Sequence, residues 1–193
     1  MGHPIWIGLV AVVLALIIGL TGAVVLSGFE NSVPTPAATA PTPAGPTTFV
    51  NLTITYDPAT GMANYTTPSV SMVAHTLVVV TITNYDTMAG ALLVPWDNQV
   101  IGTVGDSELV NYGSNPYRVT SLPAHDISHT FTVLDAFYNI SVPIPPAVSP
   151  LAPVVVTFEL TLSQPETTSW GCMCECGNGV MGARMYGQLV ISG

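Results

Sequence analysis

From Phe49 onward, the sequence is a succession of short segments with β-strand patterns. Some alternate apolar and polar residues and others are β-branched or apolar runs; they read FVNLTITY, HTLVVVTITN, GALLVP, HTFTVLD, PVVVTFELTL and YGQLVIS. Gly, Pro, Asn and Asp separate them, and none has the 3.6-residue period of an amphipathic helix. Many short strands at regular spacing are typical of a sandwich or barrel. We therefore expect residues 49–193 to form one all-β domain, an antiparallel β-sandwich.

Residues 5–28 form an apolar run without a charged side chain, which predicts a transmembrane helix. Roughly 24 residues at about 1.5 Å each span a hydrocarbon core of about 30 Å. A cleaved signal peptide has an apolar core of about 7–15 residues after a basic start. This run is longer, and no Lys or Arg precedes it. We expect residues 1–29 to be an uncleaved anchor in the plasma membrane.

A Pro- and Thr-rich segment separates the anchor from the domain. Residues 33–48 read VPTPAATAPTPAGPTT, and Pro at this density favours an extended, semi-rigid stalk. Residues 30–48 are therefore expected to be a linker. Asn51, Asn64 and Asn139 each begin an N-x-[ST] triplet, which suits a domain on the external face of the membrane.

The charge of the chain excludes one class of partner. Lys and Arg together number 2, against 11 acidic residues, and the net charge is −9. Because binding to phosphates needs clustered basic residues, nucleic acid is not an expected partner. A surface that depends on Thr, Ser, Asn and Gly for hydration also suits an acidic external medium.

The order of the segments within the domain is specific. A strand that ends in an Asn-x-Asp turn, VVVTITNYD, precedes the apolar AGALLVP, and LPAHDISHTFTV follows later. A loop that contains Cys and ends in Met then leads into the last strand, in CGNGVMGARMYGQLVI. This order resembles the cupredoxins, and more closely the external domain of subunit II of haem-copper oxidases, which is similar in having an N-terminal anchor. The resemblance covers the anchor and most of residues 70–193, and implies a cupredoxin-like sandwich.

In that family, the motif C-x-x-x-C-G-x-G-H-x-x-M-[FY]-G holds the binuclear copper centre CuA. Cys172 and Cys176 keep the spacing of its two bridging thiolates, and Met185 fits if two residues are inserted before it. Val180 stands where the motif has histidine, and Ala89, in DTMAG, stands where a D-x-x-H-G turn supplies the other one. Neither side chain can donate to copper. The resemblance thus implies that Cys172, Cys176 and Met185 are vestigial copper ligands.

A subunit II without CuA occurs in oxidases of this superfamily that oxidise quinol directly. The resemblance therefore implies a non-catalytic component of a membrane haem-copper quinol oxidase in aerobic respiration. Its partners would be the haem-bearing catalytic subunit and other respiratory subunits. No cofactor is expected in this hypothesis, although bound copper stays open as an alternative.

A second class of function is a membrane-anchored mononuclear copper electron carrier. The loop CGNGVMGARM is similar in length to the copper loop of the sulfocyanin and rusticyanin type of protein, although it lacks that loop's histidine. Such a carrier would use Cys176, Met185 and displaced histidines. The sequence contains no G-x-S-x-G, H-E-x-x-H or Gly-rich phosphate loop, so no hydrolase or transferase is indicated.

The three cysteines leave several alternatives open. Cys172 and Cys176 are the natural pair for a disulfide in an external domain, with Cys174 left over. The three thiols, with nearby methionines, could instead bind Cu(I) through sulfur. Zinc is a third alternative, although no histidine lies at finger-like spacing.

The four histidines give little indication of a site. His125 and His129 flank a turn and could reach one metal ion, but we expect both side chains to be exposed to solvent. His75, at the start of a strand, is the only one that could replace a lost ligand, by a shift of register. Arg184 lies inside the Cys-to-Met loop, where a buried cation would be costly, so we expect this loop to face a partner or solvent.

Overall fold

The computed structural model describes residues 45–175 and 185–193, which form a β-sandwich. The strands are β1 (Thr47–Asp57), β2 (Met62–Tyr65), β3 (Ser69–Val73), β4 (Leu77–Asn84), β5 (Glu108–Asn111), β6 (Tyr117–Val119), β7 (His129–Leu134), β8 (Asn139–Ile144), β9 (Val154–Thr161), β10 (Glu166–Gly171) and β11 (Tyr186–Ser192). Two single turns of 3-10 helix, η1 (Pro95–Asn98) and η2 (Ala124–Asp126), lie in the connections.

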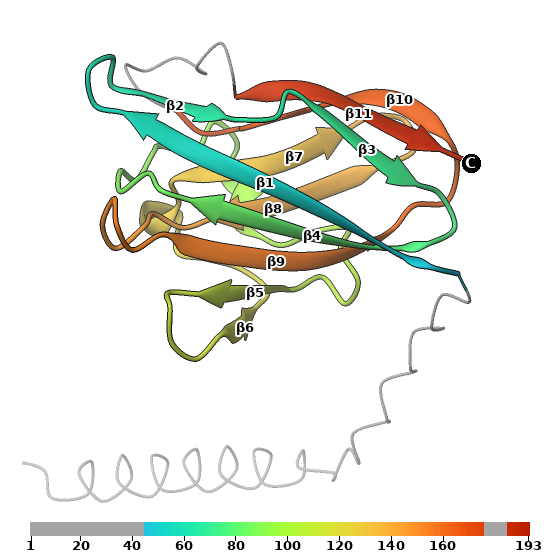
Figure 1. Ribbon diagram of the computed structural model, residues 1–193, viewed down its shortest axis with the longest axis horizontal. Helices are drawn as coiled ribbons and strands as arrows, with labels where there is room; N and C mark the ends of the chain where they lie inside the picture. The colour runs from blue at the N-terminus through green and yellow to red at the C-terminus, as the bar shows by residue number, and fades with distance from the viewer. Residues whose placement is uncertain (1–44, 176–184) are drawn as a thin grey trace, which may run out of the picture. The chain divides into compact units, whose positions relative to one another are not determined.

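Two sheets stack face to face (Figure 1). The six-stranded sheet has the order β2-β1-β4-β9-β5-β6, and the five-stranded sheet has the order β3-β11-β10-β7-β8. The predicted sandwich is confirmed, but the expectation that it is antiparallel is wrong for two strand pairs. β1 pairs with β4 in parallel, and β3 pairs with β11 in parallel. The reason is topological: β3 belongs to the opposite sheet, and the chain then returns to lay β4 beside β1.

Aromatic side chains fill the centre between the sheets. Phe131 of β7 lies with its ring centroid 5.8 Å from that of Phe158 on β9 and 5.5 Å from that of Trp170 on β10. Tyr65 meets the Trp170 ring edge to face at 4.6 Å. All four side chains are almost fully buried. Because aromatic contacts add to the burial of apolar area, this cluster ties the two sheets together.

Strands predicted from long β-branched or alternating segments are confirmed. HTLVVVTITN, PVVVTFELTL and YGQLVIS contain β4, β9 and β11, and β4 alternates between half-buried and buried residues along its whole length. The predicted strand GALLVP is wrong. Within it, Leu92 makes one isolated bridge to Cys174, and Pro95 already begins η1. Pro has no N–H to donate to a ladder, so this segment cannot extend as a strand.

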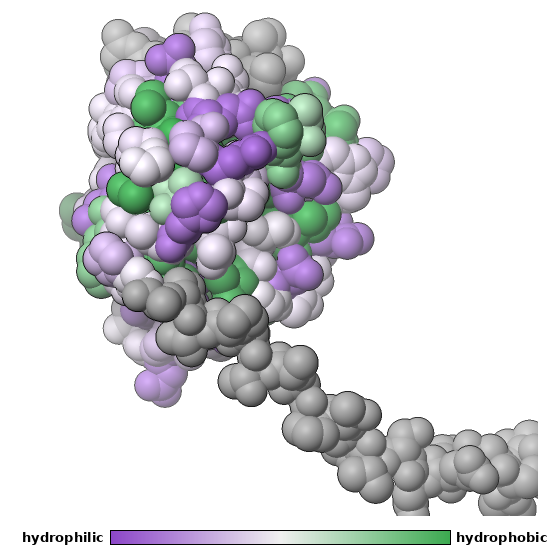
Figure 2. Space-filling view, turned by 90° about the vertical axis from the view of Figure 1, so that its right-hand side faces the viewer, coloured by the Kyte–Doolittle hydropathy of each residue, from purple (hydrophilic) through white to green (hydrophobic). Residues whose placement is uncertain are grey.

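The expected anchor, residues 1–29, lies outside the described residues, as does most of the expected linker. β1 begins at Thr47 and so includes the last two residues of that linker. No helix in residues 45–175 or 185–193 is long and apolar enough to cross a bilayer. At the end of the sandwich where β11 finishes, hydrophilic and hydrophobic side chains are intermixed on the surface (Figure 2).

Candidate metal centre

The first residue of β7, His129, is a buried histidine at one end of the sandwich. Its side chain is 1% exposed, and five consecutive positions of β7 are buried. Both faces of this strand are covered, because Phe131 packs in the aromatic core while Thr132 contacts Asp97 of η1. His129 is therefore held away from water in the described structure.

Cys172, directly after β10, presents its thiol to His129. Its Sγ lies 3.9 Å from Nδ1 of His129, and the side chain is 0% exposed. The backbone N–H of Thr130 donates to the same sulfur, at 3.3 Å. Because β10 pairs with β7, the end of one strand delivers the thiol to the start of the other.

The other ring nitrogen of His129 is bound to a carboxylate. Nε2 lies 3.0 Å from Oδ2 of Asp86, which is 3% exposed and follows β4 in the opposite sheet. The imidazole thus spans from the thiol to the acid, with one ring nitrogen toward each. Burial alone would lower the pKa of His129, but the hydrogen bonds to Asp86 and Cys172 outweigh it and raise this pKa to about 9.

Met185 lies beside Cys172, immediately before β11. Its side chain is fully buried, and its carbonyl oxygen accepts a hydrogen bond from the N–H of Cys172 at 2.8 Å. The chain therefore enters and leaves the segment between these residues at neighbouring points. This hydrogen bond fixes the base of the loop that the sequence motif identified.

Residues 89–93 cover the segment that carries the thiols. The N–H of Leu93 donates to the carbonyl oxygen of Met173, and the N–H of Glu175 donates to that of Ala91. Gly90 is required here, since a Cβ atom at this position would lie 2.9 Å from the carbonyl oxygen of Glu175. Cys174, in the covered segment, is 0% exposed.

The loss of a histidine at Ala89 stays a prediction, but the structure shows a histidine elsewhere beside Cys172. Ala89 is exposed, whereas His129 occupies the place beside Cys172. The expectation that His129 is a solvated turn residue is wrong, because it begins a strand that is covered on both faces. The signal that could have found it is present in the sequence: Asp126 and His129 have the same Asp-x-x-His spacing as the oxidase motif.

The other two described histidines lie apart from this centre. His125 is on the surface, with 83% of its side chain exposed. His75, the candidate replacement ligand, is exposed in the turn from β3 to β4. β3 runs parallel to β11 with Val73 opposite Ser192, so His75 follows the end of the sheet opposite to the one where β11 begins at Tyr186. The replacement by His75 is therefore excluded.

The described residues do not include Cys176, Val180 or Arg184. The Cys172–Cys176 disulfide and the loss of a ligand at Val180 therefore stay predictions. Among residues 45–175 and 185–193, no group of three or more His, Cys, Asp and Glu side chains is placed to hold a metal ion. Asp86 and Cys172 face opposite nitrogens of the same ring, which is why these two and His129 cannot all bind one ion.

His129 and Cys172 nevertheless fit a soft first-row metal as a pair. Imidazole nitrogen and thiolate sulfur lie about 2.0–2.1 and 2.3 Å from such a metal, so at an angle of about 110–120° they are about 3.6–3.8 Å apart. The observed separation is 3.9 Å. His, Cys and a long axial Met are donors of copper electron-transfer sites, and Met185 is buried next to Cys172. Such copper sites have two histidines, whereas the described residues supply only His129, together with Cys172 and Met185.

A second polar cluster lies between η1 and the five-stranded sheet. Asp97 is 0% exposed and accepts hydrogen bonds from the hydroxyls of Thr132 and Ser141. Burial raises the pKa of this carboxyl, although these hydrogen bonds oppose the shift. Thr130 connects the cluster to the thiol segment, because its hydroxyl bonds to that of Thr132 and accepts from the N–H of Met173. The cluster braces the residues around Cys172.

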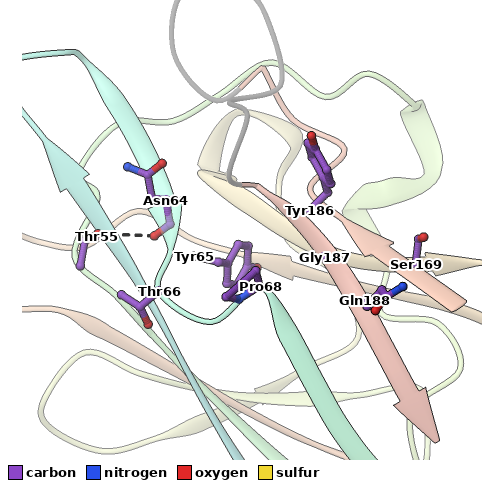
Figure 3. A pocket seen from close by; sticks show the side chains of 9 residues that line it. All are labelled: Thr55, Asn64, Tyr65, Thr66, Pro68, Ser169, Tyr186, Gly187 and Gln188. Carbon is purple, nitrogen blue, oxygen red and sulfur yellow. Dashed lines mark hydrogen bonds between the residues drawn. The ribbon is translucent and has the colours of Figure 1, made fainter. Parts of the chain in front are cut away.

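A groove of about 750 Å³ lies between β1–β2 and β10–β11 (Figure 3). The nine residues labelled in Figure 3 line it, and none of these nine is a His, Cys, Asp or Glu. Two of the lining residues are joined by a hydrogen bond, in which the N–H of Gln188 donates to the carbonyl oxygen of Pro68 at 2.8 Å. The groove is therefore separate in chemistry from the candidate metal centre.

No protein-family model and no curated protein matches the chain. Among solved structures, the chain is similar to rusticyanin from Thiobacillus ferrooxidans, with 14% identity over 77% of this chain and 79% of that chain and a TM-score of 0.41. A further rusticyanin structure, described as a copper protein, has 16% identity over 77% and 80% of the two chains and a TM-score of 0.38. A multicopper oxidase from Campylobacter jejuni has 8% identity over 77% of this chain and 31% of that one, with a TM-score of 0.45.

In the present chain, two stacked sheets carry Cys172 at the end of β10 and Met185 at the start of β11. The described domain is a two-sheet β-sandwich with a buried His–Cys pair at one end.

Proposed function

We propose that this chain is a membrane-anchored copper protein that transfers single electrons, with His129 and Cys172 as its strong ligands. The observation that carries the proposal is the placement of Nδ1 of His129 3.9 Å from Sγ of Cys172, with both side chains buried. Soft thiolate and imidazole donors select copper over hard cations. This favours the copper carrier over the copper-free subunit as the main hypothesis.

The residues around the pair prepare it to bind a metal. The N–H of Thr130 stabilises negative charge on Sγ of Cys172, and the Met185 carbonyl fixes the backbone of that cysteine. Met185 is the candidate for a weak axial ligand. Cys176, which lies between them in the sequence, is the candidate for a third strong ligand. Bound copper would supply a one-electron redox centre.

Burial makes this arrangement suitable for electron transfer and unsuitable for covalent catalysis. The order Cys172, His129, Asp86 also matches a thiol nucleophile with its base and orienting acid. Reactive cysteines of that kind are partly exposed, whereas Sγ of Cys172 belongs to a side chain with 0% exposure. A tightly enclosed pair instead keeps its geometry when an electron arrives or leaves.

The location and the partners follow from the sequence. The uncharged run at residues 5–28 supports an anchor in the plasma membrane with the domain on the external face. A haem-bearing catalytic subunit of a terminal oxidase is the partner that we propose as the electron acceptor. The paucity of Lys and Arg supports a protein partner and no nucleic acid.

A subunit II-like component of a haem-copper quinol oxidase is the second candidate. Cys172 and Cys176 keep the spacing of the two CuA thiolates, and Asp126 and His129 keep the Asp-x-x-His spacing. The imidazole at Val180 is then still missing, and Thr130 stands where the D-x-x-H-G turn has glycine. In this candidate the domain binds no copper and covers the external face of the catalytic subunit.

The metal content of the full-length chain, purified in mild detergent under reducing conditions and loaded with copper, distinguishes the candidates. One copper per chain, with a thiolate-to-copper absorption band, supports the carrier; no copper supports the copper-free subunit; two coppers with a mixed-valence spectrum indicate an intact CuA centre.

In the carrier, His129→Gln should abolish copper binding. His125→Gln, an exposed histidine four positions away, is the matched control and should bind like the unmodified chain. Equal copper binding by both variants would refute the proposed ligand pair.

A further inference from the structure

We infer that Asp86 is a positioning residue of the metal centre, which sets the tautomer and orientation of His129 so that Nδ1 faces Cys172 with an available lone pair. This inference rests on the proposed function for its role in metal binding. Its structural basis is the bond of 3.0 Å between Oδ2 of Asp86 and Nε2 of His129, both in side chains that are at least 95% buried.

Asp86 is itself held by four further hydrogen bonds. Its other carboxylate oxygen, Oδ1, accepts from the N–H of Met88 at 2.9 Å, and its own N–H donates to Oδ1 of Asn84 at 2.9 Å. Its carbonyl oxygen accepts from Nδ2 of Asn84 at 3.3 Å and from the N–H of Ala147 at 2.7 Å. Asn84 is anchored in turn, because its Nδ2 also donates to the carbonyl oxygen of Pro145 at 2.9 Å. The backbone of Asp86 is therefore fixed to β4 and to the segment after β8, and rotation of its carboxylate would break the bond to the N–H of Met88.

Both carboxylate oxygens of Asp86 face donors, and this decides the tautomer. Oδ1 is occupied by a backbone N–H that cannot change its role. Oδ2 can only accept, so the neutral imidazole of His129 must place its proton on Nε2. Nδ1 then carries the lone pair and faces Sγ of Cys172. Metal-binding histidines are commonly fixed in this way by a carboxylate on the second nitrogen, which also makes the ligand nitrogen more basic.

Asp86→Asn separates this role from a merely structural one. The amide of Asn has the same shape as the carboxylate but only one acceptor oxygen, and this oxygen would accept the hydrogen bond from the N–H of Met88. The NH₂ group then faces Nε2 of His129 and donates to it, so the ring proton moves to Nδ1. That tautomer points an N–H at Cys172 and cannot bind the metal there. In a serine protease triad, the same change of acid to amide leaves the geometry intact and selects the wrong tautomer.

The test compares Asp86→Asn and Asp86→Ala with Asp126→Asn in the full-length chain. Asp126 ends η2, three positions before His129, and its side chain is 57% exposed, so its variant removes a nearby charge without touching the ring. Copper affinity should fall by about 10–100-fold in Asp86→Ala, by at least as much in Asp86→Asn, and not in Asp126→Asn. If the isosteric Asn variant binds copper as tightly as the unmodified chain, Asp86 has no positioning role.

A second readout works without copper. Nitrogen-15 NMR of the imidazole in the copper-free protein, at a pH where the ring is neutral, should show the proton of His129 on Nε2 in the unmodified chain and on Nδ1 in Asp86→Asn. The His129 signals are assigned by their absence in His129→Gln, and circular dichroism confirms that each variant is folded. The same tautomer in both proteins would overturn the inference. If the tautomer moves as expected but the unmodified chain binds no copper, the proposed function fails and the Asp86–His129 relationship stands.

Discussion

Sγ of Cys172 and Nδ1 of His129 lie 3.9 Å apart, although 43 positions separate these residues in the chain. One follows a strand of the five-stranded sheet and the other begins the neighbouring strand, so their contact depends on the pairing of β10 with β7. Asp86, from the end of a strand in the opposite sheet, binds the far side of the same ring. The candidate centre therefore joins both sheets.

Replacement of Cys172 tests which thiol matters. Cys172→Ala should remove copper binding and its thiolate-to-metal absorption band, because this sulfur faces His129. Cys174→Ala is the matched control, a second fully buried cysteine two positions away. Copper stoichiometry and absorption spectra measure both. A loss of the band in Cys174→Ala alone would move the ligand role to Cys174.

Glu108 should make the domain more stable in acid than in base. Its side chain is 0% exposed, and burial raises its pKa to about 9, above its ordinary value of 4.5. The folded state holds this proton more tightly, so the stabilisation is fully present below the unfolded pKa. It decreases as pH rises from about 4.5 to about 9.

Glu108→Gln removes this proton and should flatten the decline in stability across that pH range, which could reach a few kcal/mol. Urea unfolding at a series of pH values is the measurement. A stability that changes with pH equally in both proteins would contradict the assignment to Glu108. An acid optimum would agree with the acidic external medium expected from composition.

Gly187→Ala should destabilise the sandwich, because the added Cβ would overlap the backbone of Pro68. The position of this atom lies 1.9 Å from the carbonyl oxygen of Pro68, and overpacking in a tight region costs about 1–3 kcal/mol or more. Gly171→Ala is the control in the paired strand β10, where the added atom would have its nearest contact at 3.6 Å. Denaturant midpoints should differ between the two variants; equal midpoints would refute the close approach.

Phe131→Ala should cost about 3–5 kcal/mol of unfolding free energy, as expected for a fully buried aromatic residue. Its ring lies between those of Phe158 and Trp170, so its removal loosens both sheets. Phe137→Ala changes a side chain that is 61% exposed and should shift the free energy by no more than about 0.5 kcal/mol. Chemical denaturation followed by Trp fluorescence measures both variants. A small effect at Phe131 would show that the aromatic cluster is not the centre of the core.

The sequence predicted the strands whose own residues carry the pattern. β4 and β9 are continuous β-branched runs, and their assignment needs no information from elsewhere. β8 was harder to predict, because Pro143 lies within it. This strand is at the edge of its sheet, where the missing N–H of a proline is tolerated. The parallel pairs could not be predicted either, since they depend on which sheet β3 joins.

The residues of the candidate site also differ in whether the sequence alone could predict them. Cys172 and Met185 were found because a local spacing marks them. His129 was missed because it stands where a turn meets the alternating segment HTFTVLD, and the sequence does not show that both faces of β7 are covered. Asp86 had no local signal, since its partner is 43 positions away. Contacts of this length are properties of the tertiary structure.

The parallel pairing of β3 with β11 has a consequence for how a newly made chain matures. The hydroxyl of Ser192 donates to the carbonyl oxygen of Met72 across 120 positions of sequence, and such long-range pairings form late and slowly. A nascent chain that lacks β11 leaves β3 and β10 without their shared neighbour, and Met185 has not yet been joined to Cys172. In the proposed copper carrier, a partly synthesised chain therefore lacks the contact between Met185 and Cys172, and copper is expected to bind only after β11 has been made and paired.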